Sequence, residues 1–145
     1  PPGSNKLQLL YKNIAYPNGI AISPDNKVIY IAEFAKNRIV AAPAAGISGN
    51  EVPHVFAHFE GGFGPDGLTV DAEGNVYVAR FQAGEVTVLD PNGFQYGSIR
   101  LPASASTFVS NLVLHDGYMY VTDSLKNDVW RIKINKNAAT PYGIQ

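Results

Sequence analysis

Three polar residues stand at matching points of the chain, each at the start of a segment of alternating apolar residues. They are Asn18, Asp66 and Asn111. Carboxylate and amide oxygens are the ligands that a hard cation such as Ca²⁺ requires, and a set without cysteine or histidine suits calcium or magnesium better than zinc. Asn-Gly and Asp-Gly dipeptides also form ordinary turns, so the same residues have a purely structural interpretation.

The segment 64–79 shows most clearly how such a residue is positioned. Leu68 and Val70 alternate with polar residues, as in a half-buried strand. Residues 72–75 (Ala-Glu-Gly-Asn) then supply a turn, and residues 76–78 resume the extended pattern with β-branched and aromatic side chains. The segment is therefore predicted to form a β-hairpin.

Two further segments, residues 17–32 and 110–122, repeat this hairpin. Ile20, Leu68 and Leu112 match one another at spacings of 48 and 44 residues, within the range of about 40 to 50 residues that is typical of propeller blades. In a propeller the start of each innermost strand faces the mouth of the central channel, so the three polar residues should converge there. We therefore predict an all-β protein built from β-propeller blades of four antiparallel strands, three blades per chain.

The predicted blades follow one another along the chain. The expected parts are a flexible leader or tag remnant at 1–6, an outer closing strand at 7–14, blade 1 at 15–62, blade 2 at 63–104, blade 3 at 105–136 and a tail at 137–145. Blade 3 has no fourth strand of its own in this pattern. Because propellers ordinarily close with four to eight blades, we predict a two-fold homodimer in which each copy gives residues 7–14 to the other, so that a six-bladed ring forms.

The composition restricts the partners. With 11 basic and 12 acidic residues the formal net charge is −1, which gives no electrostatic footprint for nucleic acid or an anionic membrane. No apolar run approaches the roughly 18 to 20 residues that a bilayer crossing needs, and there is no cysteine for disulfides or thiolate catalysis. We expect a soluble protein, cytoplasmic or exported with its signal already removed, whose partner is a small molecule, an ion or another chain.

Two motifs give the chain a family resemblance. Residues 16–25 contain Pro-Asn-Gly-Ile-Ala-Ile-Ser-Pro-Asp, and residues 64–75, about one blade later, contain Pro-Asp-Gly-Leu-Thr-Val-Asp-Ala-Glu-Gly-Asn. Together they resemble the SMP-30/gluconolactonase/luciferin-regenerating-enzyme family of six-bladed propellers, and residues 108–121 resemble that family's next blade. The match covers nearly the whole chain, but only the C-terminal half of a usual family member.

The resemblance implies roles for the three polar residues. In that family the Asn of the Pro-Asn-Gly motif and the Asp of the Pro-Asp-Gly motif bind a catalytic divalent cation, which implies Asn18 and Asp66 as ligands of Ca²⁺, with Mg²⁺, Mn²⁺ or Zn²⁺ as alternatives. Asn111 falls where related enzymes place a polar residue that lines the substrate pocket. The implied reaction is hydrolysis of a small lactone, in which the cation polarises the carbonyl group and activates water while Asp66 serves as general base.

The chain also departs from that family. A Glu from the first blade and an Asn from a middle blade complete the family's metal shell, and this chain has neither blade. Two other interpretations therefore stay open: a non-catalytic NHL-like propeller module that binds a protein or small ligand, and an inactive half-propeller fragment. Charged residues that end the second strand of each blade are predicted to face solvent or to make inter-blade polar contacts rather than to act in catalysis. They are Glu33, Arg80 and Asp123.

Overall fold

The computed structural model describes residues 6–46 and 52–139, in which helical structure is limited to the short 3₁₀ turn η1 (Phe34–Lys36). The strands are β1 (Pro17–Ile22), β2 (Val28–Glu33), β3 (Arg38–Pro43), β4 (His54–His58), β5 (Gly64–Val70), β6 (Val76–Phe81), β7 (Glu85–Leu89), β8 (Gln95–Arg100), β9 (Val109–His115), β10 (Tyr118–Asp123) and β11 (Asp128–Lys133). No helix in the described ranges is long and apolar enough to cross a bilayer.

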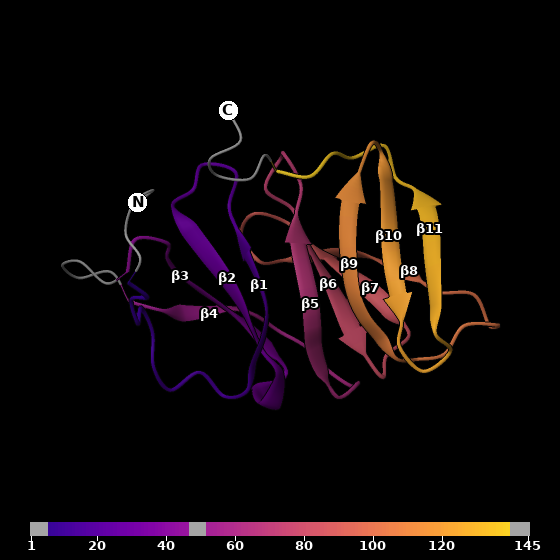
Figure 1. Ribbon diagram of the computed structural model, residues 1–145, viewed down its shortest axis with the longest axis horizontal. Coiled ribbons are helices and arrows are strands. Elements are labelled where there is room, and N and C mark those ends of the chain that lie inside the picture. The colour runs from indigo at the N-terminus through magenta and orange to yellow at the C-terminus, as the bar shows by residue number, and fades with distance from the viewer. Residues whose placement is uncertain (1–5, 47–51, 140–145) are drawn as a thin grey trace.

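The strands form three antiparallel sheets, each built from consecutive strands. Blade 1 is β1–β2–β3–β4, blade 2 is β5–β6–β7–β8 and blade 3 is β9–β10–β11. The inner strand β5 packs against both β1 and β9, and the three sheets stand side by side (Figure 1). The predicted all-β class with propeller blades is confirmed.

The inner strands begin earlier than the apolar alternation indicated. β1 begins at Pro17 and β5 at Gly64, before the first apolar residues of the alternation, Ile20 and Leu68. The reason is a β-bulge: Pro17 pairs with Glu33 and Ile20 with Ile31, so β1 carries one more residue than β2 over this stretch. β5 and β9 contain the same kind of irregularity. A bulge changes the direction of the side chains within it, which here are the polar residues of interest.

Apolar side chains fill the space between neighbouring blades. Blades 1 and 2 share a buried cluster that includes Ile39 and Leu68, and blades 2 and 3 share a second cluster that includes Val86 and Met119. Trp130 packs against the second cluster. Complete burial of an aliphatic side chain of this size contributes about 1.5 to 3 kcal/mol. The clusters therefore fix the position of each blade, and with it the start of each inner strand.

The chain after β11 does not continue blade 3 but crosses to blade 2 (Figure 1). The Ala139 amide donates a hydrogen bond to the Val70 carbonyl at 2.9 Å, and the Ala72 amide donates one to the Asn137 carbonyl at 3.0 Å. We call residues 137–139 the strap. It meets β5 at the end of that strand, away from Asp66 near its start, and blade 3 has no fourth strand within the described residues.

Residues 7–14, which we expected to form an outer strand, form no strand in the single chain. Tyr11 and Ile14 instead pack against Ile31 on the side of blade 1 that faces away from blade 2. The Tyr11 hydroxyl donates a hydrogen bond to the Pro43 carbonyl. Strand pairing needs a neighbouring strand with a free edge, and blade 1 already has four strands. Pairing of this segment with a second copy involves another chain and stays a prediction.

Candidate metal site

Asn18 and Asp66 lie near the starts of β1 and β5, and the structure brings them together. The Asn18 side chain lies close enough to the Asp66 carboxylate to lower the pKa of that group. Asp66 is half-buried and Asn18 is exposed, so the pair is open to solvent on one side. Two oxygen-bearing side chains from different blades are thus direct neighbours, as the prediction of convergence requires.

The close approach of β1 and β5 depends on the glycine that follows Asn18. A Cβ atom on Gly19 would lie 2.8 Å from the Gly67 Cα and 2.9 Å from the Leu68 amide nitrogen, and it would also collide with the Asp66 carbonyl oxygen. These are backbone atoms, which cannot rotate away as a side chain does. Glycine at this position therefore sets the distance between the two strands that carry the polar pair.

Burial raises the pKa of the Asp66 carboxyl above its ordinary value, and the nearby Asn18 side chain only partly offsets this effect. Burial acts in this direction because it disfavours the charged form of a carboxyl group. The ionised form is then stabilised by any cation that binds beside it. Two oxygen ligands, one of them a carboxylate, fit part of the coordination shell of a hard divalent cation.

Asn111 does not occupy the same position in its blade as Asn18 and Asp66 do in theirs, although the sequence analysis matched the three residues. In the pairing with the neighbouring strand, Asn111 takes the register position of Gly67, and Ser110 takes that of Asp66. The Asn111 side chain still lies beside β5, because a Cβ on Gly67 would be 2.7 Å from its Cγ. Its Oδ1 accepts a hydrogen bond from the Leu112 amide at 2.9 Å. The predicted positional match is wrong by one residue, and the substrate-binding role stays a prediction.

Buried charged residues hold the segments that lead into the inner strands. They are the last residues of β2 and β10 and the penultimate residue of β6: Glu33, Asp123 and Arg80. Glu33 accepts a hydrogen bond from the Ala15 amide at 2.8 Å. Arg80 donates one to the Gly61 carbonyl at 2.8 Å. Asp123 accepts one from the Ser106 amide at 2.7 Å.

These three contacts share one function, since each ties down the backbone a few residues before an inner strand. The prediction that the three residues face solvent is wrong, and the alternative of polar contacts to the connections between blades is confirmed for Arg80 and Asp123. Their recurrence at one strand position was visible in the sequence. Their burial was not visible in the sequence, because the alternation of apolar residues does not indicate which backbone segment will cover the end of a strand.

Replacing Asp123 with asparagine is expected to destabilise the protein at neutral pH by roughly 1 to 3 kcal/mol, the usual effect of breaking a buried hydrogen-bond set. Burial alone raises the pKa of this carboxyl, but hydrogen bonds from the Ser106 hydroxyl and amide and from the Lys126 amide outweigh burial and lower it below 3.8. The carboxylate therefore contributes stability above pH 3.8 that is lost as the pH falls through the lower folded value.

Urea denaturation of the wild type and of Asp123→Asn over a series of pH values measures this effect. The difference in stability should be large at pH 7 and should shrink toward acid. Asp116→Asn, at an exposed turn position, is the matched control and should change little at either pH. A difference for Asp123→Asn that is independent of pH would contradict the assignment.

A row of aromatic rings lies at the end of the molecule where the inner strands begin. Successive ring centroids are 5.6 Å apart for Tyr16 and Phe34, 5.5 Å for Phe34 and Phe63, and 6.1 Å for Phe34 and Phe81. Phe81 and Phe108 follow at 4.7 Å in an edge-to-face arrangement. Tyr16 and Phe63 are exposed, and each stands two or three residues before Asn18 or Asp66 in the chain. Apolar surface therefore borders the polar pair.

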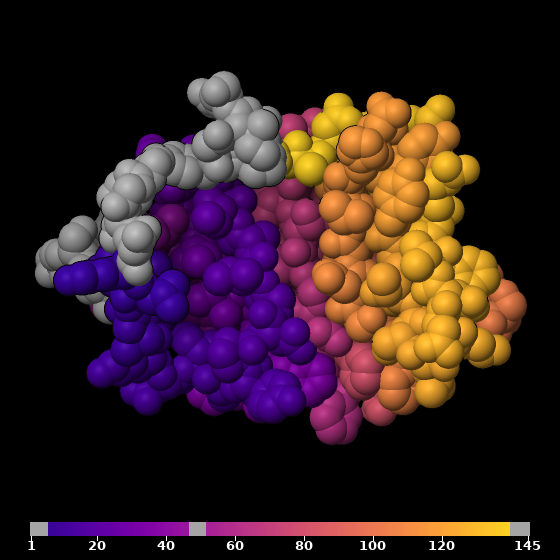
Figure 2. Space-filling model, in the orientation of Figure 1, coloured from indigo at the N-terminus to yellow at the C-terminus, as the bar shows by residue number. Residues whose placement is uncertain are grey.

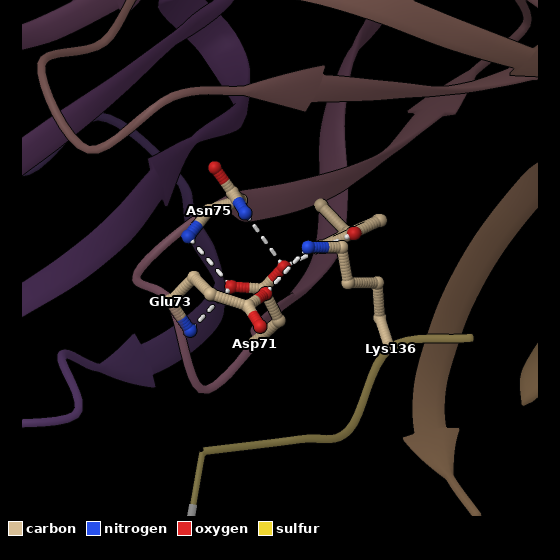
Figure 3. Close-up of polar contacts among 5 residues, drawn as sticks. Asp71, Glu73, Asn75 and Lys136 are labelled. Atoms are coloured by element: carbon tan, nitrogen blue, oxygen red, sulfur yellow. Dashed lines mark hydrogen bonds and ion pairs between the residues drawn. The ribbon is translucent and has the colours of Figure 1, made fainter. Parts of the chain in front are cut away.

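A second group of polar side chains, around Asp71 and Glu73 near the opposite end of β5, has a structural role (Figure 3). Asp71 is completely buried and accepts hydrogen bonds from the Glu73 amide at 3.0 Å, the Asn75 amide at 2.9 Å and side chain at 2.7 Å, and the Tyr77 hydroxyl at 3.2 Å. Glu73 forms an ion pair with Lys136 at 2.6 Å. The hydrogen bonds use both Asp71 oxygens and hold the predicted turn at residues 72–75. The ion pair of Glu73 holds Lys136, the residue before the strap. The described ranges contain no group of three His, Cys, Asp or Glu arranged to hold a metal.

The amino-acid sequence was compared with known protein families and with individual proteins, and it matches one family. The model of the SMP-30/gluconolactonase/LRE-like region matches residues 2–114. The chain is 34% identical over 108 residues to the lactonase drp35 of Staphylococcus aureus (strain MRSA252) and 34% identical over 107 residues to that of Staphylococcus epidermidis. Each alignment covers 70% of this chain and 32% of the relative, so the chain spans about a third of the length of these lactonases.

Two solved structures have the same fold over almost all of the chain. The calcium-binding protein regucalcin from Agrobacterium tumefaciens superimposes with a TM-score of 0.76 at 23% identity, over 94% of this chain and 51% of its own. The gluconolactonase XC5397 from Xanthomonas campestris superimposes with a TM-score of 0.75 at 25% identity, over 92% of this chain and 42% of its own. In each case the three blades correspond to about half of the larger protein.

Proposed function

The chain belongs to the SMP-30/gluconolactonase/LRE-like family, and from this premise we propose that it is a divalent-metal-dependent hydrolase of small lactones, with Ca²⁺ as the preferred cation. Asn18 and Asp66 would hold the cation, and Asn111 would contact the substrate. Kinship with staphylococcal lactonases supports the reaction type. Because the chain spans only part of these relatives, the activity of the whole relative is an inference for this chain and needs its own test.

The observation that carries the proposal is the pair of Asn18 and Asp66 on the neighbouring inner strands β1 and β5, with the Asn18 side chain near the Asp66 carboxylate. Ionising a half-buried carboxyl group with a raised pKa costs free energy, and groups of this kind cluster at functional sites. Its neighbour contributes an amide oxygen, which is a suitable second ligand for a hard cation. The exposure of Asn18 leaves room for water and substrate.

The chemistry follows from these groups. A bound divalent cation supplies polarisation of the lactone carbonyl and lowers the pKa of water. Asp66 would accept the proton that the attacking water loses when its oxygen bonds to the carbonyl carbon. The ring C–O bond then breaks, and the proton passes to the departing ring oxygen to give the hydroxy acid. Asn18, next to Asp66, would help to orient the Asp66 carboxylate.

The aromatic row beside the pair favours substrates with an apolar part. Tyr16 and Phe63 expose their rings next to the segments that carry Asn18 and Asp66. Burying such a ring against an apolar group yields about 25 cal/mol for each Å² removed from water, whereas a polyhydroxylated lactone gains little from that surface. We therefore expect aliphatic or aromatic lactones to be hydrolysed more readily than sugar lactones.

Thermal unfolding with Ca²⁺ and with a chelator, together with a lactone assay, tests the proposal. A cation bound only by the folded chain stabilises it by about 2.7 kcal/mol at a hundred times its Kd, so Tm should rise with Ca²⁺ concentration. Dihydrocoumarin, δ-valerolactone and gluconolactone should be hydrolysed only in the presence of a divalent cation, the first two faster. The chelated protein is the matched control.

Two results would contradict the proposal in different ways. Hydrolysis at an unchanged rate in chelator would mean that the reaction does not need the cation. No shift of Tm with Ca²⁺, Mg²⁺, Mn²⁺ or Zn²⁺ and no hydrolysis of any lactone would instead favour a non-catalytic propeller module. A faster reaction with gluconolactone than with dihydrocoumarin would overturn the role given to the aromatic row.

A further inference from the structure

The connection between blades 1 and 2, residues 59–63, lies at the end of the molecule that holds the candidate metal site. It leads from β4 into β5, and its last residue, Phe63, stands three positions before Asp66. Figure 2 shows the magenta residues around position 60 projecting at the lower edge of the molecule, the end at which β5 begins in Figure 1. Gly61 and Gly62 both have positive φ, 67° and 68°, so the chain turns sharply there. An exposed turn of this kind is mobile unless other groups hold it.

Arg80 holds this connection from blade 2. It pairs with Pro65 in the β5–β6 ladder, so it is anchored at the start of β5. Its Nη2 donates hydrogen bonds to the Glu60 carbonyl at 3.0 Å and to the Gly61 carbonyl at 2.8 Å. The carbon of its guanidinium group lies 4.2 Å from the centre of the Phe59 ring. The side chain therefore binds the connection at three consecutive residues.

Burial of the Arg80 guanidinium has a free-energy cost. The residue is 3% exposed, and its Nε has no hydrogen-bond partner in the part of the chain that the structure describes. An unpaired polar nitrogen in the interior is unfavourable, especially on a charged group. A methionine would fill similar space without that cost. What offsets the cost here is the fixed course of the connection.

Asn37 holds the same connection from blade 1. Its Nδ2 donates hydrogen bonds to the Phe59 carbonyl at 3.0 Å and to the Gly61 carbonyl at 2.9 Å. The Phe59 amide donates one in return to the Asn37 carbonyl at 2.9 Å. The backbone of Asn37 is left-handed, with φ of 49°, a conformation that asparagine tolerates better than most residues. The Gly61 carbonyl thus accepts hydrogen bonds from side chains of two blades.

The anchored connection determines where the Phe63 ring lies. The centres of the Phe63 and Phe34 rings are 5.5 Å apart. The Phe34 ring also contacts Tyr16, which stands two residues before Asn18. Phe34 therefore links the aromatic residues that precede Asn18 and Asp66. Phe63 is 62% exposed, so its ring is available to a ligand beside the polar pair.

We propose that the connection of residues 59–63 is a rigid wall of the substrate site. Phe63 is the residue that selects lactones with an apolar part, and Arg80 and Asn37 are positioning residues that act through the backbone of the connection. The inference rests on the proposed function, since it requires that a lactone binds at the candidate metal site. Contact of the Phe63 ring with an aromatic group of the ligand strengthens binding about 2- to 10-fold.

Hydrolysis-resistant lactams measure this contact separately from turnover. 3,4-Dihydro-2-quinolinone is the lactam counterpart of dihydrocoumarin and carries its aromatic ring, which δ-valerolactam lacks. In calorimetric titration with Ca²⁺ present, Phe63→Ala should lower the affinity for the quinolinone by the factor given above and change that for δ-valerolactam less. KM for dihydrocoumarin should rise in parallel, with kcat unchanged. Phe94→Ala, at another exposed phenylalanine of blade 2, is the matched control and should change none of these values.

Arg80→Met and Asn37→Gly test the positioning role. Methionine keeps the packing on Phe59 without the donors, and glycine keeps the left-handed backbone without the amide group. Each substitution should weaken quinolinone binding in the wild-type background but not in Phe63→Ala, because the ring that it positions is then absent. Exchange of the Phe63 amide hydrogen, which is bonded to the Phe81 carbonyl at 2.9 Å, should be faster in both variants. Asn37→Gly carries the test alone if Arg80→Met does not fold.

The outcomes separate the wall from the proposed function. Hydrolysis by the wild type with ligand affinity and KM unchanged in Phe63→Ala would overturn the wall and leave the proposed function standing. Equal effects of the positioning variants in both backgrounds, or unchanged amide exchange, would show a merely structural role and contradict the inference. Quinolinone binding that depends on Phe63, without hydrolysis of any lactone, would support the wall and overturn the proposed function. Absence of both binding and hydrolysis would overturn both.

Discussion

Asp66→Asn is expected to abolish binding of Ca²⁺, lowering affinity by more than about 100-fold, while leaving the fold intact or slightly more stable at neutral pH. The affinity falls because the substitution removes the only charge of the Asn18–Asp66 pair. The stability rises for a different reason. The pKa of Asp66 is raised in the folded chain, so the ionised group destabilises the fold, and this effect grows as the pH rises through the folded pKa. An uncharged amide of the same shape does not have that cost.

Calorimetric titration with Ca²⁺ and thermal unfolding at pH 7.5 would measure the two effects on the same protein. Asp116→Asn, at the exposed turn between β9 and β10, is the matched control and should change neither quantity. Retained Ca²⁺ affinity in Asp66→Asn would remove Asp66 from the metal site. A marked fall in Tm would make Asp66 a structural residue instead, like Asp71 at the other end of β5.

Gly19→Ala is expected to destabilise the chain by about 3 kcal/mol, which corresponds to a fall in Tm of roughly 6 to 12 °C. The added methyl group would meet three backbone atoms of β5, at Asp66, Gly67 and Leu68. The strands must separate to admit it, and Asn18 moves with β1. Affinity for Ca²⁺ should therefore fall even though no oxygen ligand has been removed, and thermal unfolding combined with calorimetry measures both changes.

Gly97→Ala is the control for this substitution. Gly97 lies in β8, has no positive φ, and a Cβ there would meet no atom within 4 Å. Alanine at this position should be neutral or slightly stabilising, because it restricts the unfolded chain without a clash. If Gly19→Ala matched Gly97→Ala in Tm and in Ca²⁺ affinity, the close approach of β1 and β5 would not control the site.

The hairpins were predictable because their information is local. Alternation of apolar residues and a turn at residues 72–75 determine a hairpin within about fifteen residues, and the observed strands follow that pattern. The pair of Asn18 and Asp66 was predictable for a related reason, since a repeat places equivalent residues at one end of neighbouring inner strands. The packing of β1 against β5 places the two residues near each other.

Other features depend on information that local patterns do not contain. Matching Leu112 with Leu68 already places Ser110 opposite Asp66, since Asp66 lies two residues before Leu68 and Asn111 only one before Leu112; the bulged pairing of β9 agrees with this alignment. The burial of Glu33 depends on the backbone near Ala15 folding over it, which no strand pattern specifies. Residues 7–14 have the composition of a strand but form none in the part of the chain that the structure describes, because pairing is a property of two segments.

The strap has a consequence for the order of folding. Every strand pairing within a blade joins neighbours in sequence, so each blade can form with a small loss of loop entropy. The contact between Val70 and Ala139 joins residues almost seventy positions apart, across the whole of blades 2 and 3. Such a long-range contact is favourable only after the intervening strands are in place. Formation of the strap is thus a late kinetic event, and its release is an early step in unfolding.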